Sequence, residues 1–161
     1  MKKVFLVIDH LGFGGAQLQI KNAYIELINR GYKVNIINLS SNTPSEEFKY
    51  LSKAIINYPK YFKNFYFFKI IFLFTYYLKL RPQFVLSYGY TSSIYIIVSY
   101  LILPVKTIFM DRALFKTSYS FFFNLYKKFL PFAFKIVTNS EEQYLFYKIN
   151  YPKYLYKLII Q

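Results

Sequence analysis

Short apolar runs alternate with longer stretches of helical periodicity along this chain. The first run, residues 4–8 (VFLVI), is apolar at every position, which is typical of a strand buried on both faces of a parallel sheet. Asp9 and His10 end this run, a glycine-rich turn follows at residues 12–15, and apolar residues recur at helical spacing from Ala16 onward. A strand, a glycine turn and a helix form the first half of a βαβ unit.

The same alternation continues to the end of the chain. It predicts further strands at residues 33–39, 54–56, 83–87, 105–110 and 135–138. It predicts helices at residues 16–30, 61–80, 92–103, 117–130 and 141–147, a polar loop at 40–47, and one more element at 153–160. Alternating strands and helices indicate a Rossmann-like, doubly wound and mostly parallel α/β sheet with helices on both faces, in a single domain over 1–161.

Two segments raise the question of a membrane. The predicted helix at 61–80 is apolar nearly all round, so a sheet can cover one of its faces and something else must cover another. Residues 82–105 carry no charge, but Pro82, Gly89, several hydroxyl residues and Pro104 interrupt them. We therefore expect a buried strand followed by a buried helix at 82–105, with a membrane span as the less favoured alternative.

Composition narrows the function classes. The 161 residues include no cysteine and a single histidine, His10, so we expect no disulfide, no metal site and no resident cofactor. A hydrophobic fraction of 55% excludes a disordered chain. No signal peptide is visible, because the apolar run breaks at Asp9, and a cytoplasmic location is expected.

The formal net charge of +14 favours a polyanionic or membrane-surface partner, although a compositional bias toward Lys, Ile, Asn, Tyr and Phe explains it equally well. Aromatic residues accompany lysines at 58–69 and at 121–128, which suits peripheral contact with an anionic membrane. The alternative is that these helices pack on the sheet while their lysine tips reach water. No pattern of a nucleic-acid-binding module is present, and we expect no nucleic-acid partner.

The glycine turn indicates an anion site, because the unpaired N–H groups that open the next helix favour phosphate. A tight turn without a ligand is the alternative. A dinucleotide fingerprint needs a third glycine where Gln17 stands and an acid near residues 39–41, and both are missing. The Gly-Lys-Ser/Thr end of a P-loop is missing, which argues against a P-loop nucleotide-binding protein. The Gly-x-Ser-x-Gly nucleophile elbow is also missing, which argues against an α/β-hydrolase.

The opening segment resembles the amino-terminal domain of the retaining GT-B glycosyltransferases of family 4. That domain commonly opens with a strand, a Gly-Gly-Ala turn, a helix and then the segment Arg-Gly-(His/Tyr)-x-Val. The matching residues are Gly14, Gly15, Ala16, Arg30, Gly31, Tyr32 and Val34. Residues 81–89 (RPQFVLSYG) and 133–143 (AFKIVTNSEEQ) resemble two later elements of the same family.

The resemblance implies one half of a GT-B fold that shapes the acceptor site. A nucleotide-sugar donor and a glycan or lipid-linked acceptor are the implied substrates, in assembly of a surface polysaccharide at the inner face of the plasma membrane. In this family a second domain holds most of the donor. We expect that carboxy-terminal domain to be absent from this chain and needed for activity. The chain is then a fragment, a truncated reading frame, or one subunit of a split transferase whose other half is encoded separately. A non-catalytic basic, aromatic module that docks at a membrane or partner is the alternative function.

The resemblance implies roles for some residues of the site. Gly14 and Gly15 match the loop that approaches the donor phosphates. The acceptor or cleft candidates are Asp9, Tyr88, Asp111 and Arg112. Asp9 is alternatively a solvated loop acid, and Asp111 and Arg112 are alternatively a surface ion pair. Tyr88 lies where family members often have a histidine, so the catalytic residues stay unassigned. Asn139 and Ser140 are expected to cap the helix that follows them before serving as ligand contacts.

Overall fold

The computed structural model describes residues 1–62, 65–101, 103–111 and 121–160, and in this part the chain forms a seven-stranded sheet in which neighbouring strands run parallel. The strands lie in the order β3-β2-β1-β4-β5-β6-β7. They are β1 Lys3–Ile8, β2 Lys33–Asn38, β3 Ile55–Asn57, β4 Phe84–Tyr88, β5 Lys106–Asp111, β6 Lys135–Thr138 and β7 Leu158–Ile160. The α-helices are α1 Gly15–Asn29, α2 Tyr66–Leu80, α3 Tyr90–Tyr100, α4 Phe121–Phe129 and α5 Glu141–Asn150. Short 3-10 helices are η1 Glu46–Ala54, η2 Lys60–Phe62, η4 Leu130–Phe132 and η5 Pro152–Lys157.

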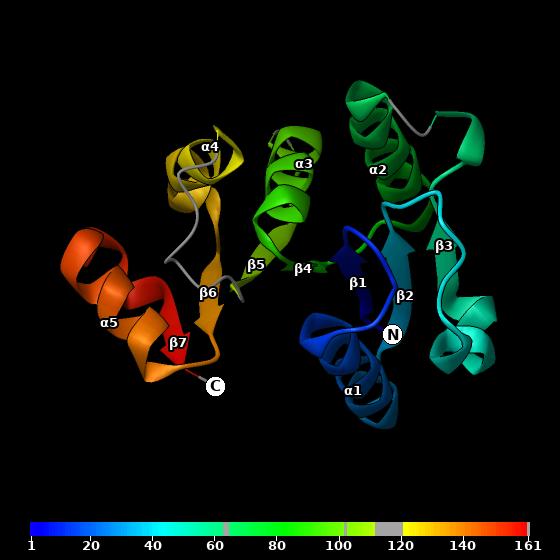
Figure 1. Ribbon diagram of the computed structural model, residues 1–161, viewed down its shortest axis with the longest axis horizontal. Coiled ribbons are helices and arrows are strands. Elements are labelled where there is room, and N and C mark those ends of the chain that lie inside the picture. The colour runs from blue at the N-terminus through cyan, green and yellow to red at the C-terminus, as the bar shows by residue number, and fades with distance from the viewer. Residues whose placement is uncertain (63–64, 102, 112–120, 161) are drawn as a thin grey trace.

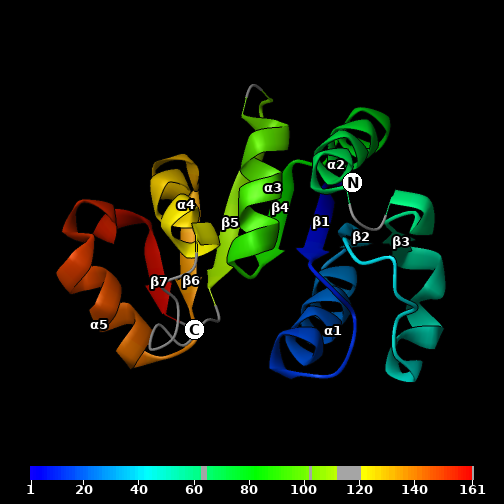
Figure 2. The ribbon, with the colours of Figure 1, turned by 45° about the horizontal axis from the view of Figure 1, so that its top comes forward.

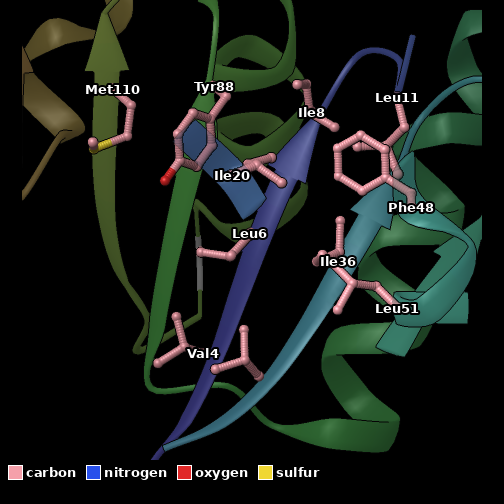
Figure 3. Close-up of a cluster of buried hydrophobic side chains, with 11 residues drawn as sticks. Val4, Leu6, Ile8, Leu11, Ile20, Ile36, Phe48, Leu51, Tyr88 and Met110 are labelled. Atoms are coloured by element: carbon pink, nitrogen blue, oxygen red, sulfur yellow. The ribbon is translucent and has the colours of Figure 1, made fainter. Parts of the chain in front are cut away.

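The central strand β1 is buried on both of its faces. Val4, Leu6 and Ile8 point toward the α1 side and join the cluster of buried side chains in Figure 3. Phe5 and Val7 point the other way and pack with side chains of α2 and α3. Burial on both faces is the reason that the run contains no polar position.

Helices cover both faces, which confirms the expected doubly wound α/β fold. Figures 1 and 2 show α2, α3 and α4 on one side of the sheet and α1 on the other. Phe48 of η1 joins the buried cluster on the α1 side. Tyr147 of α5 packs with Tyr126 of α4 and Phe109 of β5, so α5 contributes to the core on the side of α3 and α4.

The α1 face is covered better over β1 and β2 than over the strands from β4 to β7. Leu86, Ile108 and Val137 are only half-buried on this face. Ile159 of β7, which lies beside Val137, is 44% exposed. The sheet therefore presents apolar surface to solvent beside α1.

The expected helix at 61–80 begins only at Tyr66. Residues 63–64 lie outside the described part of the chain, and the segment before them forms η2. The Tyr58 hydroxyl lies 2.9 Å from the carbonyl oxygen of Phe62 and 3.1 Å from that of Phe65. This side chain satisfies the carbonyl groups of two residues that precede α2.

Other boundaries also differ from the expectation. The loop expected at 40–47 is shorter, because Glu46 starts η1, in which the buried Phe48 and Leu51 recur at the three-residue period of a 3-10 helix. The helix expected at 92–103 runs from Tyr90 to Tyr100, and the start expected for α4 at residue 117 falls outside the described residues. The final element consists of η5 followed by β7.

The uncharged stretch at 82–105 forms β4 and then α3, as expected. Most side chains of α3 are buried, including Ile94, Ile96 and Ile97. Among the helices of the described chain, none combines the length and the apolar character needed to cross a bilayer.

Candidate functional site

The carboxyl ends of β1 and β4 lie side by side in the middle of the sheet. From β1 the chain winds toward β2 and β3, whereas from β4 it winds toward β5, β6 and β7. This divergence makes a topological switch point, the usual place for a ligand in an open α/β sheet. Asp9, Gly14 and Gly15 follow β1 at this edge, Tyr88 ends β4, and Asp111 ends β5.

The glycine turn has a structural requirement for glycine at position 14. Gly14 precedes α1 with a φ of 150°, and a Cβ atom there would lie 2.7 Å from Oε1 of Gln17. Gln17 is buried, and its Nε2 atom donates a hydrogen bond of 3.1 Å to the carbonyl oxygen of His10. Gln17 thus ties the first turn of α1 to the end of β1. The φ of 150° favours glycine at position 14, and any larger residue there would also require the Gln17 side chain to shift.

A pocket of about 410 Å³, here called the turn pocket, opens over the start of α1. It is lined by His10, Phe13, Gly15, Ala16, Gln17, Gln19 and Asn139. A Cβ atom added at Gly15 would meet no atom within 4 Å, so Gly15 faces open space. No side chain of the described residues caps α1, and the amide groups of its first turn are available to an anion.

Asp9 lies at the switch point, on the side of α2 and α3. Its Oδ1 atom is buried and has no hydrogen-bond partner among the described residues, and its Oδ2 atom lies 3.6 Å from the position that a Cβ atom of Gly89 would take. Burial raises the pKa of Asp9 to about 6, although the charge of Lys69 and the backbone N–H of Ser92 favour the ionised form. Asp9 therefore exchanges its proton close to neutral pH, as groups in functional sites often do.

Lys69 of α2 supplies positive charge beside Asp9. Its Nζ atom lies 5.8, 5.6 and 5.4 Å from the ring centres of Tyr58, Tyr66 and Tyr95, respectively. Burial lowers the pKa of Lys69, and the nearby charge of Asp9 opposes that effect. Burial, and to a lesser extent Asp9, raises the pKa of Tyr95 to about 12. The three rings hold the ammonium group by cation–π attraction.

Tyr88 is buried on the opposite side of the sheet from Asp9. It packs in the cluster shown in Figure 3 and lines a groove of about 460 Å³ between α1 and the sheet. The groove and the turn pocket share Gln19, whose Oε1 atom is buried without a hydrogen-bond partner in the described part of the chain. Tyr88 therefore lines a groove that adjoins the turn pocket at Gln19, and it does not lie beside Asp9.

Asp111 is buried at the end of β5, on the side of α3 and α4, and is not a solvated surface residue. The Tyr147 hydroxyl donates a hydrogen bond to Oδ2 of Asp111, and the Tyr126 hydroxyl lies 3.1 Å from that of Tyr147. Burial raises the pKa of both tyrosines well above the usual value, so both stay neutral hydroxyl groups at physiological pH. Arg112, the remaining cleft candidate, lies outside the described residues.

Ser140 caps α5 as expected, since its Oγ atom accepts a hydrogen bond of 3.2 Å from the backbone N–H of Gln143. The Gln143 side chain in turn accepts a hydrogen bond of 3.2 Å from the backbone N–H of Asn139. The two hydrogen bonds resemble a capping box, except that the second one reaches the residue before the N-cap, and they hold Asn139 at the rim of the turn pocket.

Sequence reasoning missed three residues of this edge, namely Gln17, Gln19 and Lys69. Gln17 was noted only because it stands where a dinucleotide fingerprint would have its third glycine. The available signal for Lys69 was a single lysine inside the otherwise apolar run of α2. The residues that the structure describes include no cluster of three or more His, Cys, Asp or Glu side chains able to hold a metal.

Comparison with known proteins gives likenesses of structure. No family model matches the chain, and no curated protein sequence matches it. The apo form of the lipopolysaccharide outer core galactosyltransferase WaaB superposes with a TM-score of 0.70 at 14% identity, over 99% of this chain and 44% of that one. MurG of Acinetobacter baumannii superposes with a TM-score of 0.63 at 15% identity, over 100% of this chain and 45% of that one.

The chain therefore spans less than half the length of either protein. Both likenesses are of fold, since the sequence identities are low. The chain has the Rossmann-like α/β fold found in GT-B glycosyltransferases.

Proposed function

We propose that this chain forms the acceptor-side domain of a retaining glycosyltransferase that uses a nucleotide-sugar donor. The observation that carries the proposal is the turn pocket, where the amide groups of α1 meet the switch point of the sheet. The likeness of fold to a galactosyltransferase supports the reaction class. A lipid-linked glycan acceptor, and a role in surface polysaccharide assembly at the inner face of the plasma membrane, complete the proposal.

In this proposal Gly14 and Gly15 receive the diphosphate of the donor. The turn pocket offers backbone N–H groups to the phosphate oxygens, and Gly15 lets those oxygens approach because no Cβ atom intervenes. The amide groups and the positive end of α1 take the negative charge without a resident metal. A second domain supplies the remaining donor contacts, and transfer requires that domain.

Asp9 is the proposed contact for the acceptor hydroxyl. Its Oδ1 atom has no protein partner among the described residues and so keeps an unused hydrogen-bond acceptor. Because this atom is buried, the proposal requires neighbouring side chains to move before an acceptor hydroxyl reaches it. The positive charge of Lys69 beside it keeps a useful fraction of the carboxylate ionised. Tyr88 and Asp111 then support this edge from within the fold, and Arg112 is proposed to line the cleft.

Calorimetric titration of the full chain with uridine, guanosine and adenosine diphosphates tests the donor site. We expect one of them to bind, and Gly15→Ala to weaken that binding about tenfold, because the new methyl group enters the space of the phosphate. Thermal stability should not fall, since the added Cβ atom meets no protein atom within 4 Å. Leu18→Ala is the matched control, because Leu18 lies in the first turns of α1, is 53% exposed and does not line the turn pocket.

Absence of binding by every nucleoside diphosphate, or equal affinity in the wild type and Gly15→Ala, would contradict the donor site. A second candidate function, docking at a membrane surface without catalysis, is favoured by exposed aromatic side chains on α2.

A further inference from the structure

A further pocket lies at the carboxyl edge of the sheet, beyond the ends of β2 and β3, which lie side by side (Figure 1). It has a volume of about 310 Å³ and is lined by Ser41, Asn42, Thr43 and Lys60. The first three residues follow β2, and Lys60 begins η2 after β3. We call it the loop pocket, and the proposed donor and acceptor contacts do not include it.

The side chains around the loop pocket offer hydrogen-bond donors that have no protein partner. Within the described part of the chain, the ammonium group of Lys60 forms no ion pair or hydrogen bond, and neither do the hydroxyl groups of Ser41 and Thr43. Among the described residues no carboxylate lines the pocket, and Glu46, which lines an adjoining pocket, is paired with Lys49. An ammonium group beside hydroxyl groups, without a compensating carboxylate, suits a ligand that carries an oxyanion.

A buried asparagine holds the two sides of the loop pocket in place. Asn38 ends β2 and is fully buried, and its Nδ2 atom donates a hydrogen bond of 2.8 Å to Oδ1 of Asn57 at the end of β3. The same Nδ2 atom lies 3.4 Å from the carbonyl oxygen of Asn42, and Oδ1 of Asn38 accepts a hydrogen bond of 3.2 Å from the backbone N–H of Ser40. The loops after β2 and β3 are therefore joined through one side chain, and little ordering remains to be done when a ligand binds.

The loop pocket lies on the same edge of the sheet as the glycine turn. The loop after β2 reaches that turn, because the backbone N–H of Ser45 donates a hydrogen bond of 2.9 Å to the carbonyl oxygen of Leu11. Since β2 and β3 are the first and second neighbours of β1 on this side, their ends lie about 5–10 Å from the end of β1. A ligand in the loop pocket is therefore within reach of the switch point.

We infer that the loop pocket binds an oxyanion borne by a sugar, either a phosphate monoester or a carboxylate. Lys60 supplies the positive charge, and Ser41 and Thr43 donate hydrogen bonds to the anionic oxygens. The volume of 310 Å³ is about that of ten molecules of liquid water, which leaves room for a sugar beside the anionic group.

The inference adds to the substrate class of the proposed reaction. In the proposed glycosyltransferase this sugar belongs to the acceptor, and the loop pocket selects an acceptor with a negative charge near the hydroxyl group that meets Asp9. This selection rests on the proposed function, whereas binding of the oxyanion does not.

Amide chemical-shift titration of the ¹⁵N-labelled full chain, without any nucleotide, tests the loop pocket. The probes are glucose 1-phosphate, glucuronate, neutral glucose and inorganic phosphate. The test variants are Lys60→Gln and Thr43→Val, both at exposed positions that the fold does not depend on. The matched control is Lys53→Gln, because Lys53 is also exposed but does not line the loop pocket.

We expect glucose 1-phosphate or glucuronate to shift the signals of Ser41, Asn42 and Thr43, less so at high salt, and neutral glucose to leave them unchanged. Lys60→Gln should weaken the binding about tenfold and Thr43→Val about threefold, because the first loses a charged partner and the second a neutral one. Lys53→Gln should change it by less than about twofold.

Equal affinity in the wild type and Lys60→Gln, or equal loss in Lys60→Gln and Lys53→Gln, would overturn the inference. Binding of inorganic phosphate alone, or shifts confined to Gly15, Ala16 and Gln17 of the turn pocket, would do the same. If nucleoside diphosphates bind at the turn pocket and these probes do not bind at the loop pocket, only this inference fails. If the probes bind and the nucleotides do not, only the proposed donor site fails.

Discussion

Replacing Asp9 by asparagine is expected to stabilise the fold at neutral pH. The substitution keeps the shape of the side chain and removes an ionisable group whose Oδ1 atom is buried without a hydrogen-bond partner in the described residues. Natural proteins retain such a carboxylate where function needs it, at a cost in stability. The pH dependence of the effect separates this reasoning from a simple change in packing.

The magnitude follows from the pKa of Asp9, which is raised from 3.8 to about 6 in the folded chain. Because the folded state holds the proton more tightly than the unfolded state, the wild type is most stable below pH 3.8 and loses stability as the pH rises to about 6. At 1.36 kcal/mol for each pKa unit, the loss amounts to about 3 kcal/mol. An asparagine side chain does not titrate. The advantage of Asp9→Asn therefore grows by about 2.4 kcal/mol between pH 4 and pH 7.5, because a small part of the loss has already occurred at pH 4.

Urea unfolding at several pH values, followed by circular dichroism, measures the difference in the free energy of unfolding. Glu26→Gln is the matched control, because Glu26 forms an exposed ion pair of 2.7 Å with Arg30 and should change the stability by less than about 1 kcal/mol at any of these pH values. An advantage of Asp9→Asn that stays constant with pH, or that is larger at pH 4 than at pH 7.5, would refute the reasoning.

Three further predictions concern the surrounding structure. Gly14→Ala should lower the free energy of unfolding by about 1–3 kcal/mol, because the φ of 150° and the 2.7 Å approach to Gln17 both disfavour a side chain there. Gly15→Ala should leave the free energy of unfolding unchanged or raise it by up to about 1 kcal/mol. Equal urea midpoints for the two variants would contradict this difference. Tyr147→Phe should cost about 1–3 kcal/mol because it removes a donor to the buried Asp111, and Tyr126→Phe should cost less; the reverse order would be inconsistent with the network. The half-buried face of β4, β5 and β6 should bind the dye ANS under native conditions and limit solubility, and a monodisperse chain that leaves the dye dark would contradict this.

The sequence was sufficient for β1 to β6 and for their direction, whereas β7 was expected only as part of one more element at 153–160. Strands buried on both faces leave continuous apolar runs, so residues 4–8 and 135–138 could be predicted within one residue of β1 and β6. Local periodicity could not predict the delayed start of α2, because it depends on hydrogen bonds of Tyr58, which lies before the helix. The 3-10 helix at Glu46–Ala54 was missed because its three-residue period resembles neither an α-helix nor a strand.

The candidate site could be predicted only as a set of strand ends. Tyr88 lies beside Ile8 across the β1–β4 ladder and shares its side of the sheet, whereas Asp9 points to the other side. That separation depends on the register of two strands far apart in the sequence, which a single sequence does not contain. The electrostatic influence of Lys69 on Asp9 likewise joins residues far apart in the sequence.

Amide chemical-shift mapping of the ¹⁵N-labelled chain during titration with a nucleoside diphosphate, or with its sugar conjugate, tests the central claim most directly. The proposed donor site predicts the largest shifts at Gly15, Ala16 and Gln17, with smaller ones at Asn139 across the turn pocket. Saturating nucleotide that moves none of these signals, or that moves only signals away from the carboxyl edge of the sheet, would contradict a donor site at the glycine turn.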